Sequence, residues 1–109
     1  MDARKDRPSR EAILEIVRQK LTKDQLQRSS IYWDSRILAK DEELSIGLRS
    51  IAMPFAGTVV FVDLAPGYNW AHPCLYLLVD LNATETQTVE ASFPPFTGDI
   101  PNTVVRLLG

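Results

Sequence analysis

Two apolar runs, TVVFVDL at residues 58–64 and CLYLLVDL at residues 74–81, decide the fold. Both are apolar at odd and at even positions, so both faces of each strand need cover, and the two runs are predicted to be central strands of one sheet. Alternate side chains of a strand project to opposite faces. The richer face would carry Val60, Val62, Leu64, Leu75, Leu77, Val79 and Leu81. The second face would carry Val59, Phe61, Cys74, Tyr76 and Leu78.

An amphipathic helix is predicted ahead of these strands. Ser9 suits the N-cap position, because its hydroxyl can accept from an amide of the first turn. Steps of about 100° per residue then gather one apolar stripe, which consists of Ile13, Leu14, Ile16, Val17 and Leu21. Thr22 to Gln25 has the spacing of a capping box, which predicts a break near Thr22 and a short turn to about Arg28.

The remaining strands are shorter and alternate. Residues 31–37 have the period of a strand with one face in the core, and so do residues 44–48 and 89–93. The apolar positions change parity after Leu48, which predicts a bulge around Arg49 and Ser50. Residues 103–108 are expected to form a last short strand.

This order predicts an α+β domain in which one N-terminal amphipathic helix packs on a four- to five-stranded antiparallel meander sheet. Residues 1–8 are expected to be a flexible lead, and residues 9–109 a single α+β domain. The order of elements resembles the cystatin-type and monellin-type layout. No family motif accompanies the resemblance, so it implies architecture and carries little functional weight.

Composition excludes several classes of function. The 109 residues contain one cysteine and one histidine, too few for a disulfide or for a structural zinc site of those ligands. We expect no metal and no cofactor. The longest apolar run, Cys74 to Val79, is far below the roughly 20 residues that cross a bilayer, so no membrane role is expected. The charged N-terminus favours a cytoplasmic over a secreted protein. Residues 1–28 hold eight Lys/Arg against five Asp/Glu, without the aromatics or motif of a nucleic-acid binder, so nucleic acid is not an expected partner.

The second sheet face lacks an obvious cover, because the one helix is assigned to the richer face. Candidates for its cover are the C-terminal segment 96–108, a second copy of the chain, or a different protein. The 65–73 loop is long for a hairpin connection and carries aromatics typical of contact sites, although Tyr68 or Trp70 could instead plug one end of the sheet. We therefore expect a noncatalytic protein-binding domain (an inhibitor, adaptor or regulatory subunit) that uses this loop and the second face. The expected contact residues are Tyr68, Asn69, Trp70, Phe61, Tyr76 and Leu78.

Two alternatives stay open from the sequence. The first is a small thiol enzyme with Cys74 as nucleophile and His72 as base, which requires a thiolate stabilised by its surroundings. The second is a carrier of a small apolar ligand between the helix and a curved sheet. Asp63 and Asp80 each end a central strand, and antiparallel pairing would place them at opposite ends of the pair rather than together.

Overall fold

The computed structural model describes residues 8–46, 49–65, 73–92 and 102–108. Within these ranges, two helices precede seven strands. The helices are α1 (Arg10–Lys20) and α2 (Lys23–Arg28). The strands are β1 (Ser30–Leu38), β2 (Glu43–Ile46), β3 (Arg49–Ala52), β4 (Gly57–Asp63), β5 (Cys74–Asp80), β6 (Thr86–Ala91) and β7 (Val104–Leu108).

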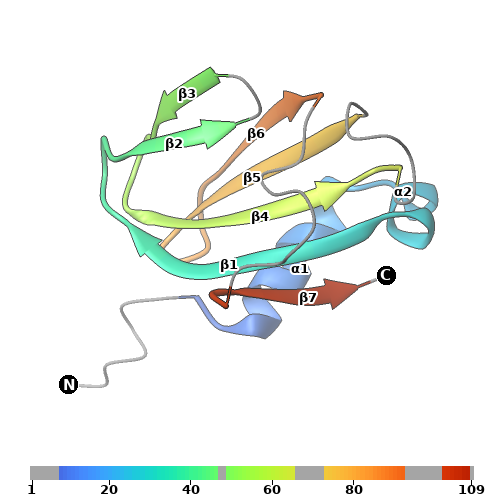
Figure 1. Ribbon diagram of the computed structural model, residues 1–109. Helices are drawn as coiled ribbons and strands as arrows, with labels where there is room; N and C mark the ends of the chain where they lie inside the picture. Colours follow the sequence, from blue (N-terminus) through green and yellow to red (C-terminus); the bar gives the residue numbers. More distant parts are fainter. Residues whose placement is uncertain (1–7, 47–48, 66–72, 93–101, 109) are drawn as a thin grey trace.

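Five of the strands form one antiparallel sheet in the order β6-β5-β4-β1-β7, and β2 pairs with β3 in a separate two-stranded sheet (Figure 1). The two apolar runs are β4 and β5, which lie inside the sheet and pair along their whole length, from Gly57 opposite Asp80 to Asp63 opposite Cys74. The α+β prediction is confirmed at this level. The prediction of one continuous meander is wrong, because β1 pairs with β4 rather than with β2.

The two helices begin where the sequence predicts. The Ser9 hydroxyl accepts from the amide of Ala12 at 3.1 Å, which satisfies one of the unpaired donors of the first turn. Thr22 and Gln25 form a reciprocal capping box that starts α2. Each N-cap of this kind contributes about 1 kcal/mol, so the break after Leu21 is set by local sequence.

The first face of the sheet packs against α1. Ile13 and Val17 on the helix and Val60, Leu77 and Val79 on the sheet are completely shielded from solvent. The prediction that the richer set of strand residues faces the helix is confirmed. The buried cluster consists of Ile13, Ile16, Val17, Leu21, Ile31, Val60, Val62, Leu77, Val79 and Leu107.

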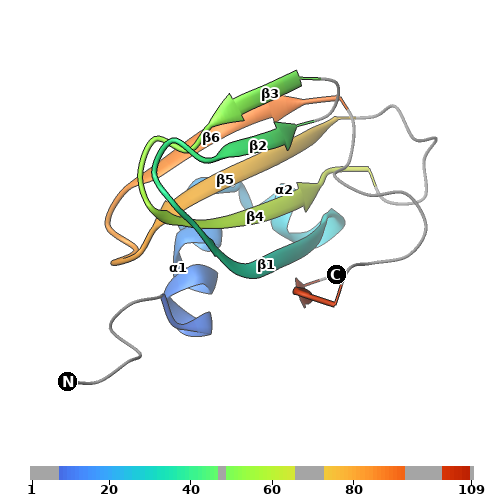
Figure 2. The same ribbon diagram turned by 60° about the vertical axis from the view of Figure 1, so that its left-hand side comes forward.

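The second face is covered by the chain itself. The change of parity after Leu48 is not a bulge but a chain reversal, because Ile46 pairs with Arg49 in an antiparallel β2–β3 hairpin. Figure 2 shows this hairpin and the helices on opposite sides of the sheet. The hairpin's apolar side joins a second buried cluster of Leu38, Ile46, Met53, Val59, Phe61, Cys74, Tyr76 and Leu78. The β2–β3 hairpin, which is none of the three expected candidates, therefore covers part of this face.

A register shift bends the first strand. The pairing of β1 with β4 is regular from Ser30 to Asp34 and then shifts before Leu38 meets Gly57. The shift changes which side chains face the sheet, so Ile37, predicted to face the core, is 37 % exposed and Leu38 is buried. None of the helices in the described ranges has the length and hydropathy to cross a membrane.

Candidate functional site

A groove of about 290 Å³ lies on the second face, between β2 and the part of the sheet formed by β1, β4 and β7. The hairpin thus leaves part of that face open. The groove is lined by Tyr32, Asp34, Arg36, Leu38, Glu42, Glu43, Leu44, Ser45, Val59, Phe61, Tyr76 and Val104. Its residues come from five strands and the turn before β2, so the fold as a whole positions them.

The floor of the groove is aromatic. The rings of Tyr32 and Phe61 stack with centroids 6.0 Å apart, and Phe61 meets Tyr76 at 5.4 Å in a tilted arrangement. The Arg106 guanidinium of β7 lies 5.8 Å from the centroid of the Tyr32 ring, a cation–π distance. Three neighbouring strands therefore hold a rigid aromatic row beneath the groove.

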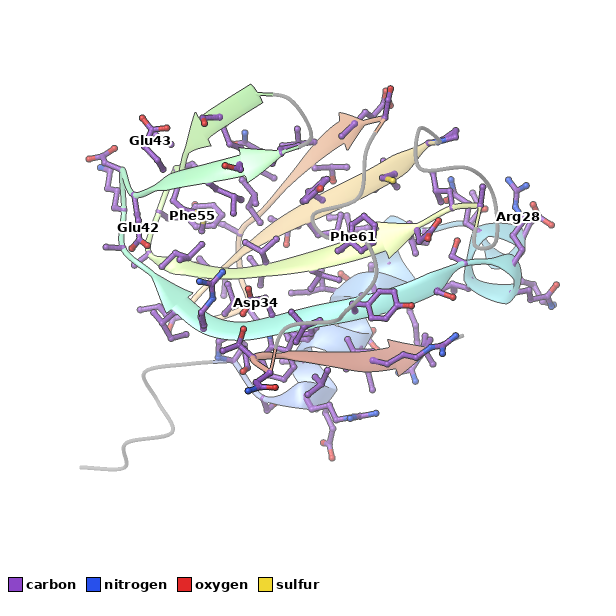
Figure 3. All side chains as sticks on the ribbon, viewed as in Figure 1. Arg28, Asp34, Glu42, Glu43, Phe55 and Phe61 are labelled. Atoms are coloured by element: carbon purple, nitrogen blue, oxygen red, sulfur yellow. The ribbon has the colours of Figure 1, made fainter. Side chains whose placement is uncertain are left out.

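The rim is charged. Asp34 and Arg36 form a bidentate ion pair, with Nε–Oδ1 and Nη2–Oδ2 distances of 3.2 and 2.8 Å. Hydrogen bonding to Asp34 and its negative charge raise the pKa of Arg36 above its ordinary value. Glu42 accepts from the amide of Ala39 at 2.9 Å, and Glu43 is exposed beside it. Figure 3 shows how Asp34, Glu42, Glu43 and Phe61 are arranged.

The structure corrects the expected role of the second-face residues. Phe61, Tyr76 and Leu78 are 4 %, 1 % and 0 % exposed, so they belong to the interior rather than to an open contact surface. Phe61 and Tyr76 reach the groove as its floor, whereas Leu78 does not line it. Tyr68, Asn69, Trp70 and His72 lie outside the described residues.

The surroundings of Cys74 oppose a nucleophilic role. Its side chain is 1 % exposed in the second buried cluster, and burial, together with the negative charge of Asp63, raises the pKa of the thiol to about 12. A nucleophilic cysteine needs the reverse, a thiolate stabilised by positive charge. The thiol is therefore held protonated at neutral pH.

We expect native Cys74 to react with iodoacetamide about a thousandfold more slowly at pH 8 than a small thiol does, because a pKa of about 12 leaves about one thiol in ten thousand ionised. Mass spectrometry of the adduct against time gives the rate. In 6 M guanidinium chloride the same thiol should react at the ordinary rate, and Cys74→Ala should give no adduct. Rapid alkylation of Cys74 in the native protein would support the alternative of a thiol enzyme.

The two strand-terminal aspartates do not meet. Asp63 pairs with Cys74 and Asp80 with Gly57, at opposite ends of the β4–β5 pair, as predicted. Burial acts to raise the pKa of Asp80, but hydrogen bonds from Glu85 and Thr84 outweigh it and leave this pKa below its ordinary value. Asp80 accepts from the Thr84 amide at 2.7 Å and so organises the turn into β6. Its role is structural, and no paired acid–base site forms.

Sequence reasoning missed the residues that make the rim. The sequence pattern places Tyr32, Asp34 and Arg36 on the solvent side of a half-buried strand. It places Glu42 and Glu43 in a solvated turn. Their convergence depends on the β1–β4 pairing and on the folding back of the hairpin, neither of which has a local signal. Within the described part of the chain, no three His, Cys, Asp or Glu side chains gather as metal ligands. No family model, curated protein or solved structure matches this chain.

Proposed function

We propose that this chain is a noncatalytic protein-binding domain, acting as an inhibitor, adaptor or regulatory subunit, that holds a segment of its partner in the groove beside β2. The observation that carries the proposal is the groove itself, in which a rigid aromatic floor meets a charged rim. Aromatic side chains in a pocket with a polar rim are typical of contact hot spots. Participation of the 65–73 loop in partner binding remains a prediction.

The size of the groove favours a protein segment over a small molecule. Pockets that enclose drug-sized ligands measure about 300–1,000 Å³, and this groove, at about 290 Å³, is at the lower limit and open along one side. It can take one or two side chains of an extended chain. An apolar carrier would need space between α1 and the sheet, where Ile13, Val17 and Val60 are completely buried against one another.

The test is selection of binding peptides from a displayed random library, followed by affinity measurement on two matched variants. Val104 lines the groove and belongs to neither buried cluster, so Val104→Trp should fill the groove without disturbing the core. Val105 is its neighbour in β7, 40 % exposed and opposite Trp33, on the other face of the sheet. Val104→Trp should weaken the selected peptides at least tenfold, and Val105→Trp should leave their affinity unchanged. Equal affinity for both variants would refute the groove as the binding site.

A further inference from the structure

We propose that the groove selects a lysine or arginine side chain of its partner. The inference rests on the proposed function and names the chemistry of the segment bound there. It is carried by the charges of the rim and the apolar walls beneath them.

The rim has an excess of negative charge. Asp34, Glu42 and Glu43 are among the residues that line the groove, and Arg36 is the one basic residue of this lining. Arg36 is neutralised by Asp34, whose two carboxylate oxygens it contacts at 2.8–3.2 Å. The negative charges of Glu42 and Glu43 remain, with Glu43 on the exposed side of the hairpin beside its pair partner Ala52. Glu42 accepts a hydrogen bond from a backbone amide, and Glu43 forms no ion pair with any described residue. An incoming cation is therefore attracted and an anion repelled.

The walls suit the aliphatic part of a long basic side chain. Leu38, Leu44 and Val59 line the groove together with the charged residues, and β7 adds Val104. Lysine and arginine bury their methylene stems along such surfaces and keep the charged end in water. A basic residue can thus satisfy both the apolar wall and the acidic rim, whereas a wholly apolar residue satisfies only the wall.

The arrangement along β1 indicates where the cation binds. Arg106 already occupies a position near the Tyr32 ring, so that part of the aromatic row has a cation from the chain itself. Glu42 and Glu43 approach the groove from the hairpin side instead. The partner's charged group is therefore placed at the hairpin side, away from Arg106.

A separate partner fits better than a second copy of the chain. The exposed basic residues of the described chain are mostly on the helices, among them Arg18, Lys20 and Lys23. The helices lie on the opposite side of the sheet from the β2–β3 hairpin (Figure 2), whose strand β2 lines the groove. Docking the helices of one copy into the groove of the next would be a head-to-tail contact, which builds rings or open chains of molecules rather than an interface that joins the same patch of two copies.

The experiment uses three blocked pentapeptides with a central residue between two leucines and glycines at the ends. The central residue is lysine, its uncharged isostere norleucine, or glutamate. Chemical-shift changes of ¹⁵N-labelled protein give both the dissociation constant and the binding site. The lysine peptide should shift groove amides, bind more tightly than the norleucine peptide, and weaken when NaCl is raised from 50 to 500 mM.

Glu43→Gln should weaken the lysine peptide about two- to fivefold, the usual range for loss of an exposed ion pair, and leave the norleucine peptide unchanged. Glu15→Gln removes one exposed carboxylate from α1, on the other side of the sheet, and should change neither affinity. Equal groove binding by the lysine and norleucine peptides would overturn the charge preference and leave the binding groove standing. Absence of groove shifts with all three peptides would overturn both. The protein alone should also be sedimented at several concentrations. If its mass rises with concentration and Glu43→Gln abolishes this rise, the occupant of the groove is a second copy of the chain rather than a separate partner.

Discussion

Gly57→Ala is expected to destabilise the protein by about 3 kcal/mol or more, the upper end of the cost of forcing a methyl group into a packed interior. Gly57 opens β4 and pairs on both sides, with Leu38 of β1 and Asp80 of β5. A Cβ at this position would overlap the carbonyl oxygen of Val79 and lie 2.8 Å from its carbonyl carbon and 3.0 Å from the Cα of Asp80. All three atoms are backbone, so no rotamer change can relieve the overlap.

Urea unfolding followed by circular dichroism measures this effect. Ala52→Val enlarges an exposed residue of β3 and should change the free energy of unfolding by less than about 0.5 kcal/mol, as surface substitutions usually do. An unfolding midpoint for Gly57→Ala within error of that of the unchanged protein would mean that β4 and β5 can separate at this point.

Local chemistry accounts for the parts of the fold that the sequence predicts. Ser9, Thr22 and Gln25 cap the helices through contacts three residues away, so a window of four residues contains the whole signal. The two faces of β4 and β5 follow from the period of a strand alone, and the two buried clusters divide as that period requires. Predictions of this kind need no knowledge of which strands are neighbours.

The hairpin illustrates what local patterns cannot supply. A change of parity between Leu48 and Ile51 is compatible with a bulge in one strand or with a reversal between two. Only the pairing of Ile46 with Arg49 distinguishes them, and its stability depends on a sheet face far away in the sequence. The strand period predicts the second-face set correctly, but the expected covers are the C-terminal segment 96–108, a second copy or another protein, whereas the β2–β3 hairpin covers part of this face.

Local sequence patterns do not predict the candidate groove for the same reason. Asp34 and Glu42 are only eight positions apart, yet they line one groove because β1 bends and the chain then folds back over Phe61. Residues 29–109 hold nine Asp/Glu against four Lys/Arg, an excess that the sequence alone does not locate on the surface. The structure gives part of that charge a location beside an aromatic floor, and this placement carries the functional proposal.

Met53→Asp is expected to release the hairpin from the sheet and to cost at least about 3 kcal/mol, because it removes a buried apolar side chain and leaves an unpaired charge among apolar neighbours. Met53 is completely buried in the second cluster, and its amide and carbonyl extend the hairpin through bonds to Glu42 and Asp41, both at 2.9 Å. A two-stranded hairpin is at best marginally stable alone in water. Its order therefore depends on contact with the sheet.

Hydrogen exchange measured by NMR shows which strands lose their structure in Met53→Asp. The amides of β2 and β3 should lose protection in Met53→Asp, and the exposure of Phe61 and Tyr76 should produce binding of a hydrophobic dye. Ser50→Asp adds the same charge to the exposed side of β3 and should retain protection. Because β2 forms one wall of the groove, peptide binding should disappear with hairpin protection in Met53→Asp and persist in Ser50→Asp. If Met53→Asp leaves the hairpin amides unprotected but peptides still bind, the binding surface lies elsewhere on the molecule. If the hairpin amides of Met53→Asp stay protected, Ile46 and Leu44 are sufficient to hold the hairpin on the sheet.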